Sequence, residues 1–236
     1  MNKYYYDLHI HSCLSPCGEN DMTPANIAGM AFLKELDIIA LTDHNSCKNC
    51  TPFIKCCKKY GLLAIPGMEI NTEEEIHAVC LFPTLEASIE FDKYVYSKLP
   101  NIKNNVDIYG HQYIVDENDN IIDEVPNLLI NATTISIINL KSIVSEFNGV
   151  CFPAHIDKSS YSILSVLGSV PEECNFNTFE FSKVQLIDKV LSQEKNIEKA
   201  NILTNSDAHY LWDISEKYNY IELKNKSIKD LFYFIR

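Results

Sequence analysis

The sequence predicts an α/β domain built around parallel strands. Three observations support this: the first third of the 236 residues alternates strand-like and helix-like segments, the last third resumes the alternation, and the composition is ordinary for a globular protein, with 46% apolar and 22% charged residues. A chain of this length buries a sizeable core and corresponds to one domain, or to one domain with an insert.

The first elements can be placed by their patterning. Residues 4–11 alternate and are rich in aromatic side chains, which is typical of a strand. Thr23 and Pro24 predict a helix, with Thr23 as N-cap and Pro24 at the first helical position. Its apolar stripe is predicted to contain Ile27, Met30, Ala31 and Leu33. Residues 38–41 are a short apolar run, as expected of a strand covered on both faces.

The same signals for helix starts and ends recur further along the chain. Thr51 and Pro52 predict a second helix, and Gly61 ends it. Residues 62–65 and 76–82 are predicted to be the next strands. A repeated order of strand and helix builds parallel sheets.

The middle of the chain breaks this pattern. Residues 85–99 are predicted to form a helix, residues 113–125 a hairpin with a polar tip, and Ser136 the N-cap of another helix that ends near Asn148. We therefore expect an inserted α/β segment at about residues 84–135.

The last third returns to the earlier alternation. Strands are predicted at residues 150–153, 178–181 and 202–204, and a C-terminal helix is predicted from Ser227.

Charge and composition exclude several classes of protein. The net charge of -12 argues against a general nucleic-acid binder and against a polybasic membrane-surface protein. There is no run of about 18 apolar residues and no apolar signal core at the start, so we expect neither a membrane span nor export by that route. Nine cysteines without such a signal predict reduced thiols and a cytoplasmic location.

Only one arginine is present, and it is the last residue, Arg236. An anionic substrate must therefore be held without the two-pronged hydrogen bonds of a guanidinium group.

Six of the seven histidines occur in similar settings beside the predicted strands. Because the carboxyl ends of strands in a parallel barrel meet at one mouth, we expect these side chains to converge with two carboxylates. The expected set is His9, His11, His44, Glu69, His77, His155, Asp207 and His209. Imidazole and carboxylate groups suit Zn, Mn and Fe, and eight donors fit two or three ions. His111, in the inserted segment, is interpreted as an ordinary loop histidine.

These motifs resemble those of the PHP family, the polymerase and histidinol phosphatase superfamily. The matching motifs are Asp7-Leu8-His9-Ile10-His11-Ser12, Thr42-Asp43-His44-Asn45, Gly67-Met68-Glu69, Glu75-Ile76-His77, Pro153-Ala154-His155 and Ser206-Asp207-Ala208-His209. The resemblance implies a distorted (βα)7 TIM-like barrel over residues 1–236, with the insert near its mouth. It also implies a site of two or three divalent metal ions that hydrolyses phosphate esters, with the eight residues as ligands and Glu69 as the bridge.

One motif departs from the family pattern. The stretch after the first motif usually reads Ser-Asp-Gly, and that Asp is often a ligand. Here the sequence is Ser15-Pro16-Cys17-Gly18-Glu19-Asn20-Asp21. Glu19 or Asp21 could take the role after a small shift, and Cys17 is a third option, so the third metal site stays open.

The chemistry of ester hydrolysis suggests further roles. Two metal ions neutralise phosphate oxygens and activate a water for in-line attack. The predicted catalytic residues are Glu69, His155, His209 and Asp43. Among them, His155 or His209 could protonate the leaving alkoxide.

Other residues are expected to support these groups. Asp7 and Asp43 are expected to orient ligands, and Glu180 to stand behind the site. Lys158 is our first choice to hold the phosphate, and Lys183 the second.

Four cysteines, at positions 47, 50, 56 and 57, form a separate cluster with the spacing Cys-x2-Cys-x5-Cys-Cys. This spacing fits no common zinc or iron–sulfur template. We interpret these residues as small buried hydrophobes.

The sequence thus predicts a metal-dependent phosphoric ester hydrolase acting on a small phosphorylated metabolite or nucleotide. Three alternatives stay open: a histidinol-phosphate phosphatase, a nuclease-type phosphodiesterase, and a metal- or nucleotide-binding module without catalysis. We expect no membrane partner and no nucleic-acid partner beyond a short oligonucleotide. The oligomeric state is not determined by the sequence.

Overall fold

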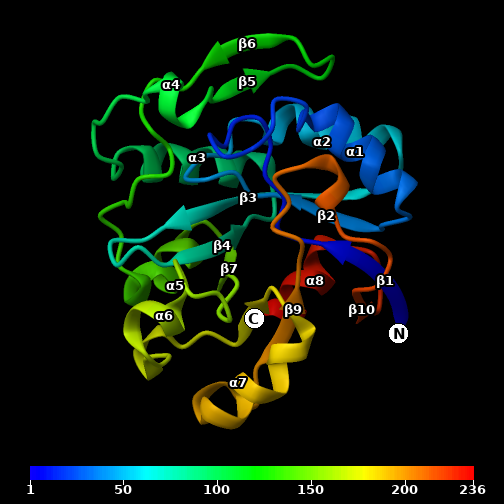
Figure 1. Cartoon of the computed structure of the whole chain (residues 1–236). Helices are drawn as coiled ribbons and strands as arrows, with labels where there is room; N and C mark the ends of the chain where they lie inside the picture. The colour runs from blue at the N-terminus through cyan, green and yellow to red at the C-terminus, as the bar shows by residue number, and fades with distance from the viewer.

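Seven strands, in one curled sheet and one adjacent parallel pair, form the wall of a barrel-like fold in the computed structural model, which describes residues 1–236 (Figure 1). They are β1 (Asn2–Asp7), β2 (Ile38–Leu41), β3 (Leu63–Asn71), β4 (His77–Leu81), β7 (Val150–Pro153), β8 (Thr178–Phe181) and β9 (Asn201–Thr204). An eighth strand, β10 (Tyr220–Leu223), pairs with the beginning of β1 in the antiparallel direction.

The β8–β9 pair lies between the two ends of the curled sheet. Strands β1, β2, β3, β4 and β7 are neighbours in that order, and β8 and β9 form a parallel pair. The Ile156 N–H donates to the Glu180 carbonyl at 2.8 Å, which attaches β8 beside β7. On the other side, the Leu8 N–H donates to Asn205 Oδ1 at 2.8 Å, just past the ends of β1 and β9. The predicted fold class, a distorted TIM-like barrel, is confirmed.

The direction of β4 differs from the prediction. An all-parallel order was expected, but β4 is antiparallel to both β3 and β7. The physical reason is the short connection: only residues 72–76 separate β3 from β4, which is enough for a turn but not for a crossover helix. The start of β4 therefore lies at the same edge of the sheet as the ends of its parallel neighbours.

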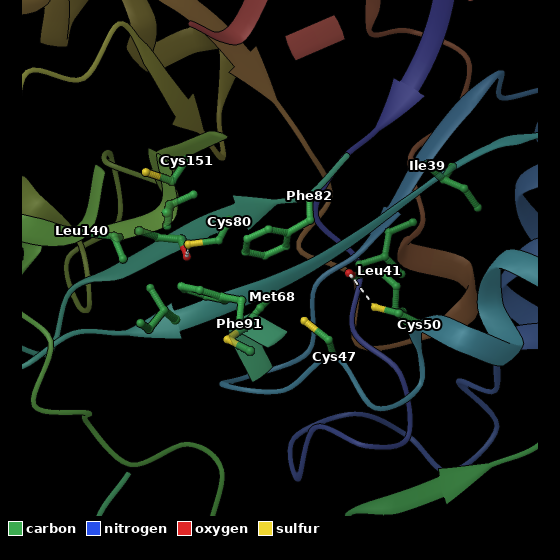
Figure 2. Packing of buried hydrophobic residues seen from close by; sticks show 14 of the residues in the cluster. Ile39, Leu41, Cys47, Cys50, Met68, Cys80, Phe82, Phe91, Leu140 and Cys151 are labelled. Carbon is green, nitrogen blue, oxygen red and sulfur yellow. Dashed lines mark hydrogen bonds between the residues drawn. The ribbon is translucent and has the colours of Figure 1, made fainter. Parts of the chain in front are cut away.

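Helices cover the outer face of the sheet. They are α1 (Pro24–Leu33), α2 (Cys50–Lys59), α3 (Leu85–Tyr96) and α5 (Ile137–Glu146). Figure 2 shows Cys50 of α2, Phe91 of α3 and Leu140 of α5 in the larger hydrophobic core, together with Ile39, Leu41 and Met68 of the sheet. The inner face is filled by a second cluster, in which Ile38 and Ile65 pack with residues of the C-terminal helix α8 (Ile228–Ile235).

Several helix starts follow the sequence signals. The Thr23 side chain accepts from the Asn26 N–H, Ser136 from Ile138, and Ser227 from Asp230. The Thr51 prediction is wrong, because α2 begins at Cys50 and its N-cap, Asn49, makes no cap hydrogen bond. Asn49 instead donates to Ser12 Oγ and accepts from the Val115 N–H, so its side chain ties two loops together.

The apolar stripe of α1 is narrower than predicted. Ile27, Ala28 and Ala31 are buried, but Leu33 is 73% exposed. The helices and strand that the sequence analysis did not anticipate include α4 (Val106–Tyr109), α6 (Ile163–Leu167), α7 (Ile187–Gln193) and β10. None of the helices combines the length and apolar character needed to cross a membrane.

The segment predicted to be an insert contains α4 (Val106–Tyr109) and a hairpin of β5 (Tyr113–Val115) and β6 (Ile121–Glu124). The hairpin lies at the top of Figure 1, at the opposite end of the molecule from α7. The Tyr113 N–H donates to the Cys13 carbonyl at 3.0 Å, so the segment rests on the loop after β1. The boundaries of the insert stay a prediction.

Candidate metal centre

The alternation of β3 places Glu69 on the inner face of the sheet. Ile65 belongs to the inner core, and Gly67 and Glu69 follow it at the same two-residue spacing. A Cβ atom on Gly67 would lie 2.8 Å from both the Cys80 carbonyl oxygen and Leu81 Cδ2. Only glycine allows this close approach of β3 to β4, which sets the position of Glu69 two residues later.

Five imidazoles surround the Glu69 carboxylate. The distances from its oxygens are 3.3 Å to His9 Nε2, 3.3 Å to His11 Nε2, 3.0 Å to His44 Nδ1, 3.0 Å to His77 Nδ1 and 3.2 Å to His155 Nε2. Burial acts to raise the pKa of Glu69, but the charges of His77, His9 and His44 hold it well below its ordinary value. The carboxylate is therefore ionised and lies at the centre of the cluster.

His77 reaches this centre because β4 is reversed. It is the first residue of β4, and it pairs with Asn71 at the end of β3. The expectation that every ligand follows a strand is therefore wrong for His77, although its place in the cluster is as predicted.

Asp207 and His209 approach from the loop after β9. Asp207 Oδ1 lies 3.3 Å from His9 Nε2 and 3.2 Å from His11 Nε2. Asp207 and His155 are non-glycine residues in the left-handed region, with φ of 52° and 30°. Such backbone strain is held in place by surrounding structure and is concentrated at functional sites.

Three overlapping groups of donor atoms result. The first contains His9, His11, Glu69 and Asp207; the second, His44, Glu69 and His77; and the third, His11, His44 and His209. His155 borders the second group through Glu69. All eight residues predicted as ligands are thus brought together from six separate segments of the chain.

The donor set fits divalent metal ions. A tetrahedral ion with bonds of about 2.1 Å holds its donor atoms roughly 3.4 Å apart. In the first group, the separations are 3.2–3.3 Å. His44 Nδ1 and Glu69 Oε2 lie 3.0 Å apart, yet both are buried atoms without a hydrogen-bond partner. Lone pairs that face a common point are explained by a shared cation rather than by a hydrogen bond.

A comparison with protein-family models decides the family. The PHP domain model matches residues 7–196. The chain belongs to the PHP family. This confirms the resemblance seen in the motifs and groups the chain with metal-dependent hydrolases.

Comparisons with other proteins place this PHP chain among distant relatives. It is 33% identical over 76 residues to an uncharacterised protein of Methanocaldococcus jannaschii, a match covering 29% of this chain and 44% of that protein. The lesion-specific endonuclease Q of Pyrococcus furiosus is similar in structure, with a TM-score of 0.65 and 19% identity over 99% of this chain and 56% of that one. A candidate metal-dependent phosphoesterase from Bifidobacterium adolescentis matches with a TM-score of 0.55 and 14% identity, covering 98% of this chain and 95% of that one. The PHP chain spans about half the length of the first relatives, and the structural likeness shows the fold.

Hydrogen bonds behind the PHP cluster orient two of its histidines. His9 Nδ1 lies 3.0 Å from both oxygens of Glu180, which also accepts from Asn205 Nδ2. The Nδ1 atom of His11 lies 2.9 Å from Ser15 Oγ, and this hydroxyl donates to Asp43 Oδ1 at 2.7 Å. Each partner fixes a ring so that its Nε2 atom faces the cluster.

Asp43 and Asp7 do not touch the cluster themselves. Asp43 accepts from the N–H and the hydroxyl of Ser12 as well as from Ser15. Asp7 accepts the N–H groups of Ser206 and Ser215, which holds the loop carrying Asp207 against β1.

The two predicted lysines differ in position. Lys158 Nζ lies 2.5 Å from Asp207 Oδ2, so its charge borders the cluster. Lys183 is exposed, and its contact is a backbone N–H to Asp157 Oδ2. The structure does not bring Lys183 into the cluster.

Glu19 and Asp21 are not brought there either. Both are exposed, and their side chains have no contact with the histidines. The third option, Cys17, is also exposed and belongs to none of the three donor groups. His111 is remote from the cluster, 3.1 Å from Glu124 in the hairpin region.

Some residues at the site were missed by the sequence analysis. Ser15 was quoted only as part of a motif, and Tyr161 was not considered. The Tyr161 ring stacks on His77 at 4.7 Å, its carbonyl accepts the His77 N–H, and its φ is 54°. The available signal for Tyr161 was its place a few residues after His155, in a polar loop.

Proposed function

We propose that this PHP chain is a phosphoesterase that uses two or three divalent metal ions to hydrolyse a small phosphate ester. The observation that carries the proposal is the sharing of Glu69 between two of the three donor groups. A carboxylate common to two groups suits a bridging ligand, and paired ions are the usual device for hydrolysing phosphate esters.

The ions would be held by the eight histidines and carboxylates of the cluster. With mixed nitrogen and oxygen donors, Zn, Mn and Fe are the candidates. The bound ions would neutralise phosphate oxygens and lower the pKa of a coordinated water towards about 7.

Protein groups would orient the ligands and the substrate. Glu180 would hold the His9 ring, and Asp43 would act on His11 through Ser15. Lys158 is the cation next to Asp207, and it would share its charge with the substrate phosphate. Asp43 is therefore better assigned as a positioning residue than as a catalytic one.

The local chemistry of His209 favours ligation over proton donation. Its Nδ1–H donates to the Asp207 carbonyl at 2.8 Å, which leaves Nε2 with a free lone pair. Burial, together with the charge of His11, lowers the pKa of His209 to about 3, so the ring is neutral at pH 7. His155 would be the candidate proton donor to the leaving alkoxide only where it is not bound to a metal ion.

A nuclease-type phosphodiesterase is the second candidate. The structural similarity to a lesion-specific endonuclease favours it and weakens the expectation that nucleic acid is not a partner. The net charge of -12 and the single arginine favour a small substrate.

One experiment separates these possibilities. Metal-depleted protein, reloaded with Mn, Fe or Zn in turn, is assayed for phosphate release from a monoester panel that includes histidinol phosphate and nucleotides. The same preparations are incubated with labelled oligonucleotides carrying an abasic site. Release from monoesters supports the first candidate, and strand cleavage supports the second. Metal-loaded protein that is inert on every substrate would leave only a binding module.

A further inference from the structure

The histidines of the cluster differ in what holds each ring in place. Three of them have a hydrogen-bonding group behind the ring, namely Glu180 for His9, Ser15 for His11 and the Asp207 carbonyl for His209. His77 has no such group: its Nδ1 atom lies 3.0 Å from Glu69 Oε1, and no protein atom bonds to its Nε2 atom. The orientation of the His77 ring therefore depends on packing.

Tyr161 supplies that packing. Its ring stacks on the His77 ring, with the centroids 4.7 Å apart and the planes at 19°. Its carbonyl accepts the His77 N–H at 2.9 Å, so one residue holds both the backbone and the ring of His77. The His77 ring also makes T-shaped contacts with His44 and His155, at centroid distances of 5.2 and 5.5 Å. A ring with one parallel and two perpendicular neighbours has little freedom to turn away from Glu69.

The loop after β7 holds Tyr161 in an unusual backbone conformation. The φ angle of Tyr161 is 54°, in the left-handed region that residues with a Cβ atom rarely adopt. Hydrogen bonds on both sides secure this loop: Asp157 Oδ1 accepts the Ser182 N–H at 2.7 Å, and the Ser162 hydroxyl donates to the Lys158 carbonyl at 2.7 Å. Strain of this kind persists where the surrounding structure enforces it, and it is concentrated at functional sites.

The position of Tyr161 is not explained by the hydrophobic core. Its side chain is 46% exposed, and it belongs to none of the hydrophobic clusters. An aromatic side chain that keeps so much of its surface in water gains correspondingly less from burial. The contact that remains to account for its placement is the stack on His77.

We propose that Tyr161 is a positioning residue that fixes the His77 ring with its Nδ1 atom towards Glu69. It would thereby set the affinity of the second donor group, His44, Glu69 and His77, for its metal ion. The stacked ring would take the part that a hydrogen bond plays behind His9, His11 and His209. This inference rests on the proposed metal centre, but not on turnover of any ester.

Metal titration of ring-deleting and ring-preserving variants tests the proposal. Metal-free wild type, Tyr161→Leu and Tyr161→Phe are titrated with Co²⁺ in competition with a chelator, which gives the affinity of each bound equivalent. Urea unfolding of the metal-free proteins measures stability separately. Tyr60→Leu is the matched control, because Tyr60 is 42% exposed and stacks on Phe32, which is not a ligand, at 5.1 Å.

The expected result is a loss confined to one equivalent. Tyr161→Leu should bind one Co²⁺ about 10- to 100-fold more weakly and the others as wild type does, whereas Tyr161→Phe keeps the ring and should bind all of them normally. Tyr60→Leu should bind Co²⁺ as wild type does, and its urea midpoint should resemble that of Tyr161→Leu.

Three results would overturn the proposal. They are unchanged affinities in Tyr161→Leu, weakened binding in Tyr161→Phe, and a uniform loss of every equivalent in a Tyr161→Leu protein that is unfolded or much less stable than Tyr60→Leu. The last would make Tyr161 a structural residue. A single weakened equivalent in a protein inert on every ester would refute the proposed function while leaving this inference standing.

Discussion

Two regions of this molecule are rich in residue types that bind metals in other proteins, but the surroundings of these residues differ. In the first, imidazoles converge on Glu69 at the mouth of the curled sheet. In the second, Cys47, Cys50, Cys80 and Cys151 lie among Met68, Phe82 and Phe91 in the outer core (Figure 2). No cysteine belongs to any of the three donor groups.

The difference lies in what each environment does to the charged form of its residues. In the first region, the surrounding imidazoles hold the pKa of Glu69 well below its ordinary value in spite of its burial. In the core, burial raises the pKa of Cys47 and Cys80 well above the ordinary value. A thiol must lose its proton to bind a metal, so these cysteines behave as small apolar side chains. Residue type alone does not make a metal site; the surrounding charges decide.

Glu69→Gln gives the most severe test of this comparison. We expect it to lower metal content and to reduce kcat/KM by more than the roughly 10- to 100-fold seen when a group behind a ligand is lost. An uncharged amide cannot offset the charge of the surrounding imidazoles or act as a ligand in two donor groups, as the carboxylate can. Metal analysis and phosphate release measure the effect. Glu73→Gln, at an exposed carboxylate nearby, is the control, and full activity of Glu69→Gln would contradict the central role of this residue.

Glu180→Gln tests the support behind the cluster. We expect metal affinity to fall by about 10- to 100-fold, because the amide holds the His9 ring less firmly than the carboxylate. Calorimetric titration with Zn²⁺ measures the change, and Glu222→Gln on the exposed side of β10 should match wild type. Unchanged affinity in Glu180→Gln would mean that the His9 orientation is set by packing alone.

Cys47→Ala and Cys80→Ala test whether the core cysteines act as apolar packing residues rather than as metal ligands. Each should lower the free energy of unfolding by about 1 kcal/mol, through lost packing, and leave metal content unchanged. Urea unfolding of the metal-free proteins measures the first quantity and elemental analysis the second. Loss of a metal equivalent from either variant would show that the two regions are not distinct.

Glu74→Gln offers the smallest effect and a check on carboxylates outside the cluster. Glu74 accepts from the Ser136 hydroxyl and the Ile137 N–H at the start of α5. Partial burial acts to raise its pKa, but these hydrogen bonds lower it below the ordinary value of 4.5.

The sign of the pH effect follows from that lowered pKa. The stabilisation by Glu74 is present above pH 4.5 and is lost as pH falls through the folded-state value. The free energy of unfolding of wild type should therefore exceed that of Glu74→Gln by about 0.5–1 kcal/mol at neutral pH, and this difference should shrink in acid. Urea midpoints of the metal-free proteins at both pH values measure it. A stability difference that grows in acid would contradict this prediction.

The sequence was informative wherever a residue's role follows from local order. The eight expected ligands meet because strand ends gather at one edge, and Thr23, Ser136 and Ser227 cap helices as their type suggests. It was uninformative where a role depends on a distant partner. The Asn49 side chain bonds to Ser12 and Val115 instead of capping α2. Lys158 and Lys183 look alike in sequence, but only Lys158 meets Asp207.

Closure of the sheet between β1 and β9 also bears on how the protein reaches its native state. The hydrogen bond from Leu8 to Asn205 joins residues 197 positions apart, so it is among the last contacts that a growing chain can make. Asp207 and His209 follow Asn205 closely in the sequence, so they reach the cluster when that hydrogen bond forms. Tight cation binding should therefore begin only when the ring is complete, and by mass action it would then hold the finished ring shut.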